Sequence, residues 1–217
     1  MIHYIVPENP DDRILARACI ALDGDQIIAF PTDTNWVLAT NLLSKKAVEA
    51  LYRLKGVDKK KHLSVLCNNI SQASRYASIS DSCFRKIRGK VPGPYTFIFA
   101  PTHEIPRAIK DYKKDNQIGI RIPDSLLCKR LIDRYDQPIL TTSITHSMLN
   151  IEQFDDEFAP HEIYSYQIEE AFPQLDVILD PGEFHSLGAS SVIDFVTNGD
   201  KPVIVREGAG EVMAGRC

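Results

Sequence analysis

Two hydroxyls and a carboxylate come directly after a buried strand, where Thr32-Asp33-Thr34 follow the apolar run 27–30 and Pro31. Hydroxyls donate or accept hydrogen bonds, and a carboxylate holds an ammonium group or a metal ion. Open α/β sheets place their ligands at such polar strand ends. The same residues also suit a turn that closes a loop or caps the helix near Ser44. The ligand-binding and turn interpretations both stay open on this evidence.

Further hydroxyls and cations lie at the ends of other predicted strands and helices. Hydroxyls hold phosphate or carboxylate oxygens, and arginine binds either group bidentately. These side chains converge on one site only if their strands share an edge of the sheet. Each one alone also fits a surface ion pair, a strand residue of high β propensity or a solvated loop. The residues are Lys55, Lys59–Lys61, Thr96, Arg121, Thr141–Thr145, Ser190, Ser191 and Arg206.

Several common enzyme and binding motifs are missing from the sequence. Gly56 is followed by lysines without a Walker A pattern, and no G-x-G-x-x-G or G-x-S-x-G motif follows a strand. The five cysteines never stand in C-x-x-C spacing, which supports neither a disulfide framework nor a zinc site and favours a reducing compartment. The N-terminus lacks the blocks of a signal peptide, and no apolar run approaches the roughly 18 residues of a membrane span. We therefore expect a cytoplasmic protein that makes no use of a membrane.

The elements that must position these residues alternate between helix and strand. Polar caps and apolar periodicity predict helices over 13–22, 45–55, 70–77, 81–91 and 125–135, with further helical structure within 103–116 and 151–170. Apolar runs predict strands over 27–30, 63–67, 95–99, 118–122, 138–145, 176–179, 190–195 and 202–206, the last two forming a hairpin around Asn198-Gly199. This pattern indicates an α/β fold, an open twisted mixed sheet flanked by helices. With no repeat or flexible linker, one domain over 1–217 with a core at about 13–210 is expected.

The net charge of −4 is unevenly divided along the chain. Residues 45–134 contain 20 Lys and Arg against 8 Asp and Glu, whereas the rest contains 5 basic and 21 acidic residues. Such a regional excess favours a surface for polyanions such as phosphates, a nucleotide or RNA. Solvated helix faces that sort by charge are the alternative.

Taken together, five motifs resemble the YrdC/YciO family, whose best-known members are L-threonylcarbamoyladenylate synthases. The likeness runs from about Arg13 to Gly210 and keeps the order of the family's motifs. Three segments match motifs of the family: Pro31–Thr34 match P-T-[DE]-T, Pro92–Phe97 match P-G-P-x-T-F, and Gly119–Pro123 match [GA]-[VI]-R-x-P. S-T-[VI]-[VI]-[DN] is similar to Ser190–Asp194, and R-x-G is similar to Arg206–Gly208.

The resemblance implies a YrdC-like fold with a concave basic surface that binds nucleotides and double-stranded RNA, here tRNA or rRNA. It implies a nucleotidyltransferase reaction that joins L-threonine, bicarbonate and ATP into threonylcarbamoyl-AMP and pyrophosphate for tRNA modification. ATP is then a substrate, Mg²⁺ a possible companion, and the protein itself is expected to hold no metal. The implied catalytic residues are Lys55 and Arg121. The implied substrate contacts are Thr32, Thr34, Arg121 and Ser190, and the implied ATP contacts are Lys55, Lys61, Ser143 and Arg206.

The chain departs from the synthase pattern at several positions. Val57 replaces the arginine of K-x-R, and Thr145 replaces the asparagine of S-x-N. His62 replaces the proline of P-L, and Asn35-Trp36-Val37-Leu38 replace x-Y-G-L. These departures resemble the YciO branch. They keep open a non-catalytic double-stranded RNA or ribosome-binding module, and a relative that handles another small substrate or an acyl phosphate.

Overall fold

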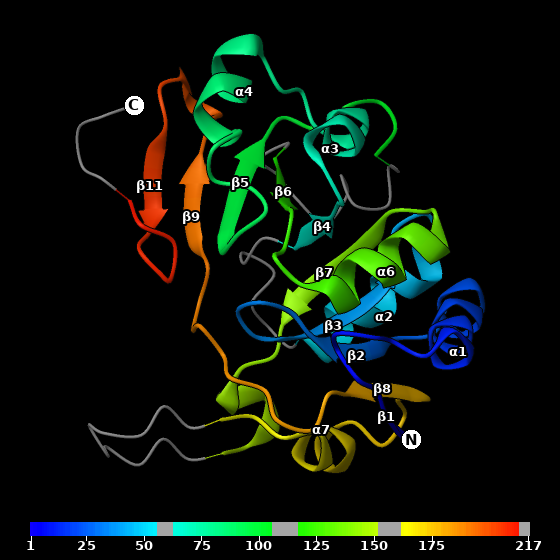
Figure 1. Cartoon of the computed structure of the whole chain (residues 1–217). Helices are drawn as coiled ribbons and strands as arrows, with labels where there is room; N and C mark the ends of the chain where they lie inside the picture. The colour runs from blue at the N-terminus through cyan, green and yellow to red at the C-terminus, as the bar shows by residue number, and fades with distance from the viewer. Residues whose placement is uncertain (56–62, 106–116, 152–161, 213–217) are drawn as a thin grey trace.

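The computed structural model describes residues 1–55, 63–105, 117–151 and 162–212. Ten strands form one mixed sheet in the order β1-β8-β2-β3-β7-β4-β6-β5-β9-β11, which runs through the whole molecule (Figure 1). This confirms the predicted mixed α/β sheet. The strands are β1 (Ile2–Tyr4), β2 (Ile28–Pro31), β3 (Trp36–Asn41), β4 (Ser64–Leu66), β5 (Tyr95–Phe99), β6 (Ile118–Arg121), β7 (Ile139–Ser143), β8 (Val177–Asp180), β9 (Ser191–Asp194) and β11 (Val203–Arg206), with β10 (Thr197–Asp200) between the last two.

The helices begin at the polar residues that the sequence offers as caps. The side chains of Asp11, Ser44 and Ser125 accept hydrogen bonds from amides in the first turns of α1, α2 and α6, as a helix N-terminus requires. The described helices are α1 (Asp12–Asp23), α2 (Lys45–Leu54), α3 (Ile70–Tyr76), α4 (Asp81–Ile87), α6 (Leu126–Tyr135) and α7 (Ser165–Ala171), together with the 3₁₀ helix η1 (His146–Leu149). None of these helices has the length and apolar composition needed to span a bilayer.

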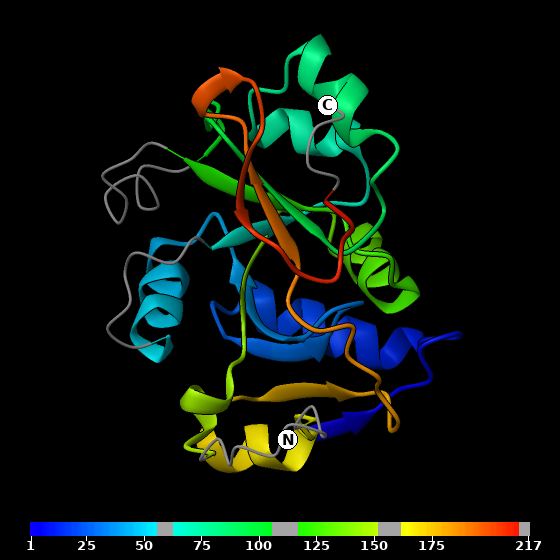
Figure 2. The ribbon, with the colours of Figure 1, turned by 90° about the vertical axis from the view of Figure 1, so that its left-hand side faces the viewer.

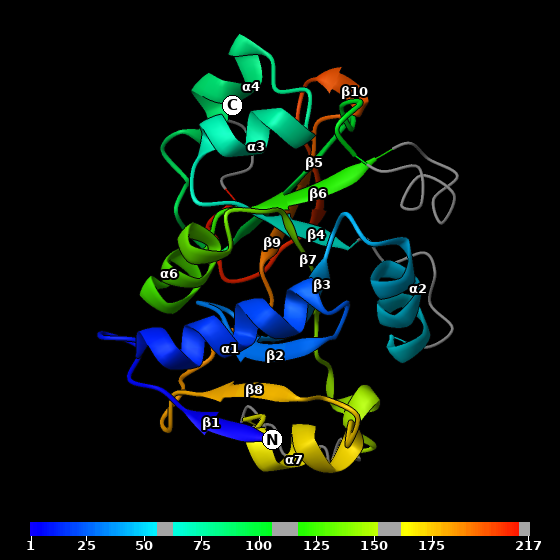
Figure 3. The ribbon, with the colours of Figure 1, turned by 90° about the vertical axis from the view of Figure 1, so that its right-hand side faces the viewer.

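Helices cover both faces of the sheet because side chains of successive strand residues point to opposite sides. In β2, Ile28 and Phe30 pack with α1 and α6, whereas Ala29 belongs to a second cluster with residues of α2, α3, α4 and α7. Figure 3 shows α1 lying across β2 with α6 beside it. Figure 2 shows α7 at the end of the molecule where the N-terminus lies, and α3 and α4 at the opposite end.

The structure differs from the sequence-based prediction at several elements. β1 and β3 were not predicted, and β2 extends to Pro31, which pairs with Trp36 in an antiparallel hairpin. Pro31 is tolerated there because it is the last residue of its strand, where a missing amide donor matters least. Helix α4 ends at Ile87 rather than at residue 91. β9 and β11 do pair antiparallel, as predicted.

Some predictions are not tested by the described residues. The helix within 103–116 lies largely outside them, as does much of the segment 151–170, of which α7 is described. The single-domain organisation and the concave basic surface stay predictions.

Candidate functional site

The Thr32–Asn35 turn joins β2 to β3 and is held together by its first hydroxyl. Thr32 Oγ1 donates to the carbonyl oxygen of Asn35 at 2.8 Å and accepts from the amides of Thr34 and Asn35 at 3.2 and 3.3 Å. Its distance to Thr34 Oγ1 is 3.3 Å, and both threonines are buried. The turn-closing role that the sequence left open is therefore observed. A contact of Thr32 or Thr34 with substrate stays a prediction.

Asp33, at the tip of this turn, forms a buried ion pair with Arg121 at the end of β6. Arg121 Nη2 donates to Asp33 Oδ1, and the two side chains are 5% and 4% exposed respectively. The second carboxylate oxygen of Asp33 accepts from the amide of Asp124 at 3.1 Å. Arg121 Nε is buried and lacks a hydrogen-bond partner within the described part of the chain. Arg121 is thus fixed from one side by the buried carboxylate of Asp33, whereas the sequence also allowed a pair with a surface carboxylate.

Ser190 and Arg206 form the neighbouring part of the site. Arg206 donates through Nε and Nη2 to the carbonyl oxygen of Ser190 at 3.0 and 2.6 Å, and Nη2 also lies 3.2 Å from Ser190 Oγ. Ser190 Oγ is 2.9 Å from Thr96 Oγ1, and both hydroxyls are buried. Partial burial lowers the pKa of Arg206, and the positive charge of Arg121 lowers it further. Two guanidinium groups therefore lie near each other, which favours a bound anion.

Backbone hydrogen bonds join the remaining motif segments to this cluster. The amide of Gly93 donates to Ile122 at 3.0 Å, and the amide of Ser191 donates to Pro94 at 3.0 Å. The amide of Gly208 donates to Ser191 Oγ at 3.0 Å. The segments at 31–34, 92–97, 119–123, 190–194 and 206–208 thus meet in one place.

Two of the predicted ATP contacts lie at the ends of other elements, and a third is not described. Ser143 ends β7 opposite Val37, with its side chain exposed. Lys55 caps the C-terminus of α2 and is half-buried. Lys61, like Val57, lies outside the described residues. The roles of these residues stay predictions.

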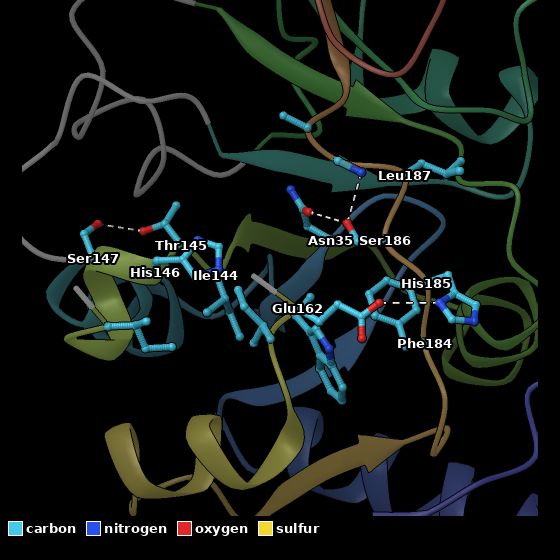
Figure 4. A pocket seen from close by; sticks show the side chains of 15 residues that line it. Asn35, Ile144, Thr145, His146, Ser147, Glu162, Phe184, His185, Ser186 and Leu187 are labelled. Carbon is cyan, nitrogen blue, oxygen red and sulfur yellow. Dashed lines mark hydrogen bonds and ion pairs between the residues drawn. The ribbon is translucent and has the colours of Figure 1, made fainter. Parts of the chain in front are cut away.

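A cavity of about 1070 Å³ adjoins the turn, and the sequence interpretation missed it (Figure 4). Its walls include Trp36 and Phe184, whose rings meet edge to face with centroids 6.1 Å apart. Ser186 Oγ donates to the carbonyl oxygen of Thr34 and lies 2.8 Å from Asn35 Oδ1. These bonds tie the loop after β8 to the turn. No local motif marks Phe184 or Ser186, because they reach the cavity through tertiary folding.

A protein-held metal has no support in the described ranges. Among residues 1–55, 63–105, 117–151 and 162–212, no group of three or more His, Cys, Asp or Glu side chains is placed to hold a metal ion. The carboxylate of Asp33 is already engaged by Arg121 and by the amide of Asp124. We therefore assign no metal ligand here.

The fold and the site define a mixed α/β protein in which five chain segments bring two arginines and several hydroxyls together. The family model Sua5_yciO_yrdC, described as "Telomere recombination", matches residues 20–208, and the chain belongs to this family. The predicted family is therefore confirmed.

The relatives include both branches that the motifs suggested. The chain is 32% identical to the uncharacterized protein YciO of Escherichia coli K12 over 209 residues, 96% of each protein. It is 29% identical to the human threonylcarbamoyl-AMP synthase over 182 residues, which are 82% of this chain and 59% of the human protein. The crystal structure of E. coli YciO superposes with a TM-score of 0.82 and 27% identity, covering 97% of both chains. P. abyssi Sua5 complexed with L-threonine superposes with a TM-score of 0.78 and 24% identity, covering 96% of this chain and 57% of that one, which supports the fold alone.

Proposed function

We propose that the chain is a nucleotide-binding enzyme with threonylcarbamoyl-AMP synthase-type chemistry. L-threonine, bicarbonate and ATP would give threonylcarbamoyl-AMP and pyrophosphate. The observation that carries the proposal is the meeting of five family motifs around Arg121, Ser190 and Arg206. The threonylcarbamoyl-AMP synthases among the relatives add support, and the P. abyssi Sua5 of similar fold, which was solved with L-threonine, is the reason for proposing this amino acid.

The reaction needs positioning and charge neutralisation more than covalent catalysis. The amine of threonine loses a proton as it adds to CO₂ released from bicarbonate, and a carbamate forms. A carbamate oxygen then attacks the α-phosphorus of ATP, and the bond to the β-phosphate breaks to release pyrophosphate. Arg206, which is partly exposed, is suited to the phosphates. Arg121 and Ser190 are suited to the threonine carboxylate, and Lys55, Lys61 and Ser143 to the rest of ATP. Any Mg²⁺ would arrive on the phosphates of ATP.

Pyrophosphate release tests the proposal directly. We expect release only when ATP, L-threonine and bicarbonate are all present. Replacing Arg206 with alanine removes one charge from the anion site, and we expect kcat/KM to fall by about 10²–10³. Arg85→Ala, which removes an exposed arginine on α4, is the matched control and should leave turnover unchanged. Pyrophosphate release that ignores threonine, or that survives Arg206→Ala, would contradict the proposal.

A second candidate is a non-catalytic double-stranded RNA or ribosome-binding module. It is favoured by the basic excess of residues 45–134 and by Val57 and Thr145, which replace two synthase residues. Binding through phosphates weakens steeply as salt concentration rises. RNA affinity with that salt dependence, together with no turnover under any substrate combination, would select this second function.

A further inference from the structure

The connection from β8 to β9 separates two cavities. Residues 184–189 line the cavity of about 1070 Å³ described above. Pro181 and residues 183–185 line a second cavity of about 350 Å³, so Phe184 and His185 belong to the walls of both. Figure 1 shows this connection running from β8, at the end of the molecule where the N-terminus lies, to β9 in the other part of the sheet. One stretch of chain therefore forms a wall that both cavities share.

This wall, residues 182–188, is called the strap below, and a glycine stands at each of its ends. Gly182 and Gly188 have φ values of +80° and +87°, in the left-handed region that other residues rarely adopt. The chain on either side is fixed, because Asp180 Oδ1 accepts from the amide of Gly182 at 2.7 Å and the carbonyl oxygen of Ala189 accepts a backbone amide at 2.8 Å. The two glycines are therefore the positions at which φ and ψ can change most easily.

Between the glycines the strap is held by side chains. No hydrogen bond from backbone to backbone joins residues 183–187 to the rest of the described chain. Ser186 Oγ donates to the carbonyl oxygen of Thr34 and lies 2.8 Å from the side-chain oxygen of the following residue. The ion pair of His185 with Glu162 is 3.5 Å long and its side chains are 84% and 39% exposed, and such exposed pairs contribute little. Ser186 is thus the main attachment of the strap (Figure 4).

The strap shields the single tryptophan of the chain. Phe184 packs edge to face against Trp36, with ring centroids 6.1 Å apart. Trp36 is 2% exposed, and its Nε1 is buried without a hydrogen-bond partner among the described residues. The indole N–H is therefore protected from water by burial alone, under a segment that few bonds hold in place.

We propose that the strap opens as a unit about Gly182 and Gly188 while the rest of the fold stays intact, with Ser186 as its latch, and that the closed strap keeps water away from the reacting groups. Opening would join the two cavities and give a path toward Ser190, which follows the strap closely in the chain. Closures of this kind admit ligands and then exclude water. The opening is argued from the structure alone. The exclusion of water rests on the proposed function, in which water competes with the carbamate for the α-phosphorus of ATP.

Exchange of the Trp36 indole proton with deuterium, followed by NMR, measures the opening. When reclosing is faster than exchange, the rate is proportional to the fraction of open molecules. Loss of one hydrogen bond changes such an equilibrium by about five- to tenfold, so Ser186→Ala should exchange faster by that factor while amides of the core strands keep their rates. Ser74→Ala is the matched control, because Ser74 Oγ also donates to a backbone carbonyl, at 2.9 Å on α3.

A second variant tests the hinge without touching the latch. Alanine at the φ of Gly188 strains the closed backbone, so Gly188→Ala should accelerate indole exchange by about fivefold or more. Unchanged exchange in Ser186→Ala or in Gly188→Ala would overturn the inference. An acceleration that the core amides share would also overturn it, because the whole fold would then be opening.

The exclusion of water is tested by comparing the amounts of threonylcarbamoyl-AMP formed and pyrophosphate released. If water enters, its oxygen bonds to the α-phosphorus, the bond to the β-phosphate breaks, a proton passes to solvent, and AMP and pyrophosphate result. We expect equal amounts in the wild type and in Ser74→Ala, and pyrophosphate in excess in Ser186→Ala. Equal amounts in Ser186→Ala would overturn the shielding role. If the wild type forms no threonylcarbamoyl-AMP, the proposed function fails, and indole exchange alone decides whether the strap opens.

Discussion

The buried ion pair between Asp33 and Arg121 gives the sharpest test of how this site is held together. Replacing Asp33 with alanine removes the partner of a guanidinium group that is 5% exposed, and also removes the acceptor for the amide of Asp124. Breaking a buried pair from one side leaves an uncompensated charge, which costs about 3–5 kcal/mol. The nearby charge of Arg206 adds repulsion to the orphaned Arg121. We expect Asp33→Ala to lower the free energy of unfolding by an amount in this range.

Urea denaturation of four proteins measures the effect: the wild type, Asp33→Ala, Arg121→Met and the double variant. Arg121→Met keeps an unbranched apolar side chain of similar length, so it removes the charge with little loss of volume. The double variant has no unpaired charge and should recover most of the loss seen in Asp33→Ala. The coupling energy from the cycle should then exceed about 1.5 kcal/mol, as expected for groups in direct contact.

A loss below about 1 kcal/mol in Asp33→Ala is the value typical of exposed pairs and would refute the reasoning. It would mean that water reaches Arg121 when its partner is removed, and that the pair does not fix the guanidinium. A double variant no more stable than Asp33→Ala would refute it equally, because the damage would then come from the turn rather than from the unpaired charge.

Three further outcomes are expected. A Cβ at Gly208 would lie 2.7 Å from the carbonyl carbon of Ser190 and nearer still to the carbonyl oxygen of Ala189. Gly208→Ala should therefore weaken ATP binding and destabilise the fold by about 1–3 kcal/mol. Gly89→Ala is the control and should have neither effect, because a Cβ at Gly89 would meet open space. Ser44→Ala removes the cap of α2 and should lower the unfolding free energy by about 1 kcal/mol in urea denaturation, with no change in ATP affinity. Burial raises the pKa of Cys67 to about 12, so at pH 8 about one thiol in 10⁴ is ionised. Mass spectrometry should then find Cys67 unlabelled by a thiol reagent until urea unfolds the protein. Because the Cys67 thiol ionises at lower pH in the unfolded chain than in the folded protein, the free energy of unfolding should fall as pH rises from about 9 to 12.

The helices were well predicted because their signals are local. Asp11, Ser44 and Ser125 stand before amphipathic runs, and each caps the helix that follows it. A capping hydroxyl or carboxylate acts on amides two or three residues away, so the sequence contains the whole interaction. The strands at Tyr95–Phe99 and Ile118–Arg121 were predicted for a similar reason, since turn-forming residues flank apolar runs of suitable length.

The two strands that were missed lack such boundaries. β3 begins directly after the Thr32–Asn35 turn, and its run Trp36–Asn41 has no alternation because both of its faces are buried. β1 has three residues and depends on pairing with β8 far along the chain. For these strands the hydrogen-bond partner decides the structure, and the local sequence does not identify the partner.

The convergence of the site was predicted from the family motifs, whereas the contacts that produce it were not. Asp33 and Arg121 are 88 positions apart, and Thr96 and Ser190 are 94 apart. The hydroxyl of Thr32 holds its own turn together, which the family motif did not predict, and its contact with substrate stays a prediction. Trp36 stands at a position of the family motif x-Y-G-L, but Phe184 belongs to none of the motifs, so the sequence did not indicate the cavity that their two rings line.

The position of the site between two parts of the sheet explains why an acid is buried at its centre. β1, β8, β2, β3 and β7 form one part, β4, β6, β5, β9 and β11 form the other, and the pairing of β4 with β7 joins them in the sheet (Figure 1). Asp33 comes from the first part, and Arg121, Ser190 and Arg206 come from the second. Burying the Asp33 carboxylate at this junction costs desolvation energy. In return, the carboxylate fixes the direction of Arg121 and partly neutralises the guanidinium groups of Arg121 and Arg206. An arginine held in this way keeps one direction before any ligand binds, which is what the proposed function requires of it.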